Sequence, residues 1–122
     1  MNVSFNTSDF VGALNKNAKK AFERNCSPLK IIAQNSQIEI IAIDKKKKLQ
    51  TGIIIDAVVL SPGRVLLSHA ITLYLMIQHD GVSKVSINYT YPDKCIKFSN
   101  NLGFVANLPI ASKNLHDEFM RK

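Results

Sequence analysis

The order of the predicted elements repeats halfway along the chain. Each half begins with a short strand, followed by a helix and then by three more strands. Sequence identity between the halves is slight, so the repeat is one of pattern. Two strand-helix-three-strand units predict an α+β domain, with two helices packed on one face of antiparallel sheets. Corresponding positions lie 61 residues apart, half of the 122-residue length: Thr7 and Ser68, Phe10 and Ile71, Leu14 and Leu75.

The chain has the length of a single domain, which we place at residues 1–110. The two units cover about 1–61 and 62–110. Residues 111–122 are polar, and they predict a C-terminal tail, the start of a linker or a short helix.

Turn residues and apolar spacing give the bounds of the elements. In the first unit, Thr7 or Ser8 can cap a helix that runs to about Asn25. In the second unit, Ser68 can cap a helix over His69–Gln78. The predicted strands are Asn2–Asn6, Leu29–Ala33, Gln37–Ile43, Leu49–Leu60, Arg64–Leu67, Lys84–Tyr91, Cys95–Phe98 and Leu102–Leu108.

The first helix is predicted to be amphipathic with a cationic polar face. Its apolar residues fall within an arc of about 120°. Lys16, Lys19 and Lys20 share the helix face opposite that arc, and Arg24 lies just beyond this lysine face. The chain carries 16 Lys and Arg against 9 Asp and Glu, a net charge of +7. Lysines that project together bind phosphates without reading sequence, so these four residues are candidate DNA contacts. A solvated helix face is the alternative.

Two further segments are ambiguous. Lys45–Lys48 would point alternately to both faces of an extended segment, so DNA contact competes with a solvated hairpin tip or a protected edge strand. The second helix is apolar around most of its circumference, with a polar wedge of His69, Thr72 and His79. Such a helix is buried on more than one side, by core packing or, alternatively, also by a neighbouring subunit.

The residues form no recognisable catalytic or metal-binding constellation. Nucleophile-elbow, P-loop, dinucleotide-binding and zinc-protease motifs are all absent from the sequence, and the carboxylates are scattered. His69 and His79 are ten residues apart on one predicted helix and do not stack as ligands. With His116, they are predicted to lie at the surface or at helix ends. We therefore predict no catalytic residues, cofactor or metal site, although distant residues can converge in a fold.

Cysteine usage and hydropathy indicate a cytoplasmic protein. Cys26 and Cys95 have no CxxC spacing, and they are interpreted as partly buried small apolar residues, with a redox pair or metal ligands as the alternative. The N-terminus does not resemble a signal peptide, and no apolar run approaches the ~20 residues of a membrane helix.

Six segments resemble parts of the first domain of the bacterial DNA polymerase III beta sliding clamp, and they occur along this chain in the same order as in that domain. The opening strand and helix match Met1–Leu14, and the second strand–helix unit matches Val65–Ile77. The last hairpin and its terminal Leu-Pro match Phe98–Pro109. The remaining segments are Ser27–Ala33, Ile41–Asp44 and Asn114–Phe119, the last of which resembles the start of an interdomain linker.

The resemblance implies a ring of six such domains that encircles duplex DNA, with helices lining the hole and sheets outside. Subunits would pair through edge strands, here Leu49–Leu60 and Leu102–Leu108. The implied interface residues are Gly103, Phe104, Val105, Ile53 and Ile55. Other clamp domains, DNA polymerase and the clamp loader are the implied partners.

The chain also departs from the clamp pattern. Bacterial clamps have three such domains in one chain, the second helix here has no Lys or Arg, and Gly103 stands where a bulky apolar residue would help to close a ring.

Three functions follow as hypotheses. The first is a sliding-clamp domain in DNA replication. The second is a clamp-like interaction protein that binds or inhibits a full-length clamp. The third is a small enzyme for anionic substrates.

Overall fold

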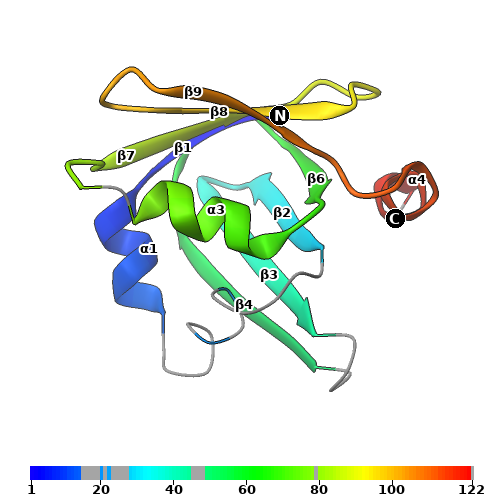
Figure 1. Cartoon of the computed structure of the whole chain (residues 1–122), viewed down its shortest axis with the longest axis horizontal. Coiled ribbons are helices and arrows are strands. Elements are labelled where there is room, and N and C mark those ends of the chain that lie inside the picture. Colours follow the sequence, from blue (N-terminus) through cyan, green and yellow to red (C-terminus); the bar gives the residue numbers. More distant parts are fainter. Residues whose placement is uncertain (15–19, 21, 23–27, 45–48, 79, 122) are drawn as a thin grey trace.

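The fold is built from two antiparallel sheets and the helices beside them (Figure 1). The computed structural model of the chain describes residues 1–14, 20, 22, 28–44, 49–78 and 80–121. One sheet has five strands in the order β5-β1-β7-β8-β9, and the other has four in the order β4-β3-β2-β6. The strands are β1 (Asn2–Asn6), β2 (Leu29–Gln34), β3 (Gln37–Asp44), β4 (Leu49–Asp56), β5 (Val58–Ser61), β6 (Gly63–Leu67), β7 (Lys84–Asn88), β8 (Cys95–Asn100) and β9 (Val105–Pro109).

The two units exchange their first strands. β1 opens the first unit but pairs with β7 of the second, with Phe5 opposite Val85. β6 opens the second unit but pairs with β2 of the first, with Leu29 opposite Leu67. Each sheet therefore contains three consecutive strands of one unit and the first strand of the other, and the five-stranded sheet also contains β5, which pairs with β1. This arrangement confirms the predicted α+β fold of two repeated units and shows why neither unit can complete its sheet alone.

The long predicted strand over Leu49–Leu60 is wrong, because the chain changes sheets at Ala57. β4 ends at Asp56, which is paired with Gln37 of β3, and Val58 is already paired with Ser4 of β1. Between them, the backbone N–H of Ala57 donates to the carbonyl of Ser36 at 3.0 Å. The β-branched run is continuous in sequence, but no single sheet carries all of it.

The first helix is shorter than predicted. α1 spans Thr7–Ala13, and Leu14 follows in an extended conformation. Gly12 and the nearby Asn15 have low helix propensity, which weakens the helix at this point. Lys20 and Phe22 are again helical.

The N-caps of both helices fall one residue from the predicted positions. They are Asn6 for α1 and His69 for α3 (Ala70–Ile77), neither with a capping side-chain hydrogen bond. Thr7 instead donates its hydroxyl to the carbonyl of Val82 at 2.9 Å inside the domain.

The core lies between the inner faces of the two sheets and the helices, and α1 and α3 lie below the five-stranded sheet in Figure 1. On the inner strand faces every second side chain is buried, as in Val3 and Phe5 of β1. Phe10 of α1 contacts both Phe5 and Phe22, with ring centroids 6.2 and 5.5 Å away. Burial of the helices therefore depends on aromatic side chains from three separate segments.

The C-terminal residues form a packed helix, one of the alternatives that their polarity left open. α4 covers Lys113–Arg121 and lies against β6. Its Phe119 is buried in a small cluster with Leu66 and Ala111. The apolar residues of α4 fall on one face, which explains why a mostly polar segment can dock.

Candidate subunit edges and nucleic-acid face

The third strand after the helix of each unit lies at the edge of a sheet. β4 is the terminal strand of the four-stranded sheet and pairs with β3, and β9 is the terminal strand of the five-stranded sheet and pairs with β8. Within the described residues, neither strand has another strand on its outer side. An edge strand presents backbone N–H and C=O groups that a further strand can pair with. The molecule thus offers two such edges at equivalent positions of its repeat.

Apolar side chains crowd the β9 edge. Phe104 and Val105 are each 57% exposed, and Leu102 is exposed as well. The preceding turn is held by Asn100, whose Oδ1 accepts hydrogen bonds from the backbone N–H groups of Leu102 and Phe104 at 2.9 and 3.2 Å. Exposed apolar residues beside an edge strand are typical of a contact surface.

Gly103 lies in this turn and not in the closing strand, where the sequence had placed it. Its φ is +85°, a left-handed conformation that favours glycine, and β9 begins only at Val105. A Cβ at this position would meet no heavy atom within 4 Å. The turn geometry accounts for glycine at this position, and a subunit contact at Gly103 stays a prediction.

The β4 edge presents a different side chain from those predicted. Ile53 and Ile55 are buried in the core of this chain, whereas Ile54 between them is 58% exposed. Because successive side chains of a strand point to opposite faces, two residues separated by one position share their environment. This burial corrects the side-chain assignment at this edge: the residue of the three that a neighbour could reach is Ile54.

The cationic helix face is described at one of its four predicted residues. Lys20 is exposed and helical, and Phe22, two positions later, is fully buried. Two positions on a helix differ by about 200°, so this pair fits the predicted amphipathic pattern. Lys16, Lys19 and Arg24 lie outside the described residues, as do Lys45–Lys48.

α3 buries one side and leaves another open. Leu73, Tyr74 and Ile77 are in the core, whereas Leu75 is 63% exposed. The prediction of burial on more than one side is wrong within this chain, and a subunit contact at Leu75 stays a prediction. The helix carries no Lys or Arg, so its exposed side adds no positive charge to the face.

Two predictions for individual side chains fail. Cys95 is free and exposed, not partly buried, because its position on β8 alternates with that of the buried Ile96. His116 is buried, not at the surface. His69 is exposed, as predicted, whereas Cys26 and His79 lie outside the described residues.

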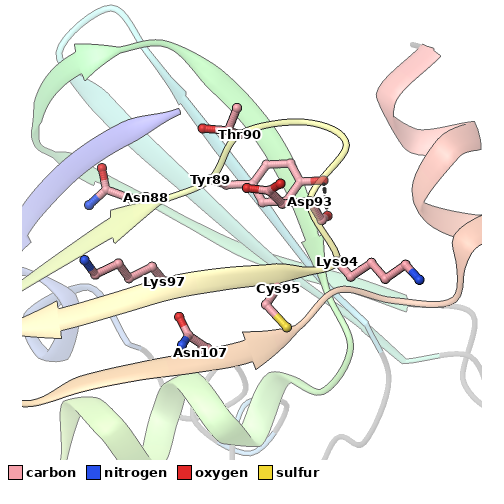
Figure 2. A pocket seen from close by; sticks show the side chains of 8 residues that line it. All are labelled: Asn88, Tyr89, Thr90, Asp93, Lys94, Cys95, Lys97 and Asn107. Atoms are coloured by element: carbon pink, nitrogen blue, oxygen red, sulfur yellow. Dashed lines mark hydrogen bonds between the residues drawn. The ribbon is translucent and has the colours of Figure 1, made fainter.

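A hollow of about 490 Å³ lies on the outward face of the five-stranded sheet (Figure 2). Asn88, Lys97 and Asn107 line it from three adjacent strands, and the Tyr89 hydroxyl donates to the carbonyl of Asp93 at 2.8 Å.

Among the residues that the structure describes, no group of three His, Cys, Asp or Glu could hold a metal ion. None of the helices in the described part is both long and apolar enough to cross a membrane.

The sequence matches no protein-family model and no curated protein. Solved structures do match. The first is Caulobacter crescentus pol III beta, with a TM-score of 0.73 at 20% identity, covering 93% of this chain and 31% of that one. The chain has the fold of a sliding-clamp domain.

Other clamps agree with this assignment of the fold. The Helicobacter pylori beta clamp matches with a TM-score of 0.73 at 15% identity, over 95% of this chain and 31% of that one. A DNA polymerase III subunit beta DnaN sliding clamp from Bartonella birtlesii matches with a TM-score of 0.69 at 18% identity, over 93% and 30%. The chain thus spans about a third of the length of these clamps.

Proposed function

We propose that this chain acts in DNA replication as a sliding-clamp domain of the first-domain type. It joins other clamp domains in a ring and binds the enclosed duplex without reading its sequence. The observation that carries the proposal is the position of β4 and β9, because the third strand after the helix of each unit lies at the edge of a different sheet. An edge on each side of one domain is what head-to-tail assembly requires.

Pairing β4 of one copy with β9 of the next would extend both sheets across the junction. The exposed Ile54 and Val105 flank these edges and would lose their contact with water on assembly. Such a contact is heterologous, since it joins two different surfaces, and it forms a closed ring when the rotation between copies divides a full turn.

The enclosed partner is duplex DNA. The proposed cationic contacts are Lys16, Lys19, Lys20 and Arg24, of which the structure describes Lys20, an exposed residue. Contact through such side chains is electrostatic and falls with salt concentration. It lets a ring slide, since no base is read. DNA polymerase and the clamp loader are the proposed protein partners of the assembled ring.

Mass in solution tests the assembly. A ring of six copies has six times the 13.6 kDa of the chain. We expect this species by light scattering at micromolar concentration and its loss in Val105→Glu, which places a charge at the β9 edge. Leu115→Glu is the matched control, because Leu115 is an exposed apolar residue of α4, which packs against β6 and not against β4 or β9. A chain that stays monomeric at high concentration contradicts self-assembly.

DNA topology tests encirclement. A ring stays on closed circular DNA and is released when that DNA is linearised. Simple electrostatic binding responds to salt but not to linearisation. Equal retention on circular and linear DNA would therefore contradict a sliding clamp.

A second candidate function is a clamp-like protein that binds a full-length clamp and blocks it. The exposed Leu75 on a helix without Lys or Arg favours this alternative, because this side of the domain is less suited to DNA. One free edge of this chain would then cap an edge of an opened clamp. Co-purification with a three-domain clamp and slower DNA synthesis by its polymerase would support this function over the first.

A further inference from the structure

The side chain of His116 is the most enclosed polar group among the described residues. It belongs to α4 and is only 1% exposed. Tyr89 packs edge-on against the imidazole, with centroids 5.4 Å apart and planes at 73°. Tyr91 stacks on it at 6.3 Å and 15°. Both tyrosines lie in the segment between β7 and β8, so the imidazole holds α4 against that segment.

The imidazole is buried without full hydrogen bonding. Its Nε2 has no hydrogen-bond partner. A neutral imidazole can leave one ring nitrogen as an unused acceptor, but an imidazolium has N–H donors at both positions and a charge to solvate. A proton on Nε2 would thus place an unpaired donor among aromatic rings, which is unfavourable.

The charged groups around the ring do not offset this cost. Asp117, next to it on α4, favours the charged form but also accepts a hydrogen bond from the Tyr91 hydroxyl at 3.4 Å. From the β7–β8 segment, Tyr89 is neutral, since burial first and then Asp93 raise its pKa to about 12. The N-terminal amine of Met1, a positive group, donates to the Tyr89 carbonyl at 2.6 Å. Burial prevails, and the pKa of His116 is lowered.

Phe119 lies one turn after His116 on the same buried side of α4 and packs against β6. The Arg64 guanidinium lies 5.3 Å and the Lys30 ammonium 5.9 Å from the centroid of the Phe119 ring. The N–H of Ala111 donates to the carbonyl of Leu66 at 2.9 Å, just before the helix. Together, α4 and this segment cover β6, the edge strand of the four-stranded sheet.

We propose that His116 is a pH-sensitive latch, which holds α4 on β6 at neutral pH and releases it when the imidazole is protonated. Release would expose Phe119 and Leu66 and uncover the edge of β6. The inference needs neither DNA binding nor ring assembly, and it concerns the part of the chain that follows the second unit.

The direction of the pH dependence follows from the linkage between proton binding and the docking of α4. The undocked imidazole has an ordinary pKa of about 6.5, and the docked one has a lower value. Docking is therefore fully favoured above about pH 6.5 and weakens as the pH falls, by up to tenfold per unit until the docked pKa is reached.

Hydrogen exchange of the full chain at pH 7.5 and 5.0 tests the latch, after correction for the intrinsic pH dependence of exchange. We expect the protection of the α4 amides and of Ala111 to fall about tenfold at pH 5.0. The amides of the β2–β3 hairpin should keep their protection. His116→Phe keeps a ring in the site and should make α4 insensitive to pH. His69→Phe is the control, because His69 is exposed, and this variant should respond like the unmodified chain.

Three results would overturn the proposal. They are undiminished α4 protection in the unmodified chain at pH 5.0, an equal loss in His116→Phe, and a parallel loss in the β2–β3 hairpin, which would indicate global unfolding. NMR titration of the unmodified chain is independent of the fold of any variant. A His116 midpoint at or above 6.5 would also exclude the latch.

Discussion

The ring of Phe22 packs edge-on against the ring of Phe10, with 5.5 Å between centroids and 67° between planes. Phe22 lies two residues after the exposed Lys20, and Phe10 lies in α1 beneath the five-stranded sheet. The contact therefore attaches the chain next to Lys20 to the core.

Replacing Phe22 with Ala should reduce the free energy of unfolding by about 3–5 kcal/mol, because the ring is fully buried. Urea denaturation at neutral pH measures the loss. Leu60→Ala is the matched control: Leu60 is 74% exposed, and its truncation should change stability by no more than about 0.5 kcal/mol. Similar losses in both variants would contradict the assigned burial.

The double variant Lys16→Glu with Lys20→Glu should weaken DNA association and flatten its salt dependence, since it removes two cations and adds two anions. Filter binding across a salt series measures both, and circular dichroism checks that the fold is retained. Lys94→Glu with Lys97→Glu makes the same charge change beside the hollow on the outward face. Equal weakening by both double variants would argue for net charge alone and against a specific DNA face.

Head-to-tail assembly predicts complementation between two edge variants. Ile54→Glu should block the β4 edge and Val105→Glu the β9 edge, so each variant alone should be monomeric. A mixture retains one intact pair of edges, so it should form a heterodimer but no ring. Sedimentation at equal concentrations measures the species, and a mixture that stays monomeric contradicts the proposed pairing.

Two glycine substitutions should have opposite effects on stability. Gly103→Ala should cost about 1–2 kcal/mol, because alanine is strained at a φ of +85° although space for its Cβ is available. Gly12→Ala should stabilise by about 0.5–1 kcal/mol, because Gly12 lies in α1 and a Cβ there also meets nothing. Thermal denaturation compares the two. A stabilising Gly103→Ala would contradict the left-handed turn.

Alkaline pH should destabilise the domain through Tyr89. Its pKa is raised to about 12, mainly by burial, so the unfolded chain loses this proton first. Stability is fully present below about pH 10 and falls as the pH rises towards 12, by about 2–3 kcal/mol in all. Denaturant titrations between pH 9 and 12 measure the slope. Tyr89→Phe should lessen it, and an unchanged slope would place the effect elsewhere.

Much of the fold follows from local pattern. Alternation of apolar residues predicted β1 and the β2–β3 hairpin, whose turn at Asn35 and Ser36 has the positive φ values of a two-residue connection. The repeat of element order predicted two equivalent units. These features can be predicted from the sequence because they depend on residues that are neighbours in the chain.

The tertiary structure decided which faces are available. The register of β4 against β3 turns Ile53 and Ile55 inward and Ile54 outward, and periodicity alone cannot tell the two faces apart. The break at Ala57 depends on Ser36, 21 residues away. The burial of His116 depends on Tyr89 and Tyr91, which lie between β7 and β8 in the middle of the second unit. The sequence determined which elements form and how they repeat, while contacts between distant segments determined which residues are left to meet a partner, because burial is a property of the assembled sheets.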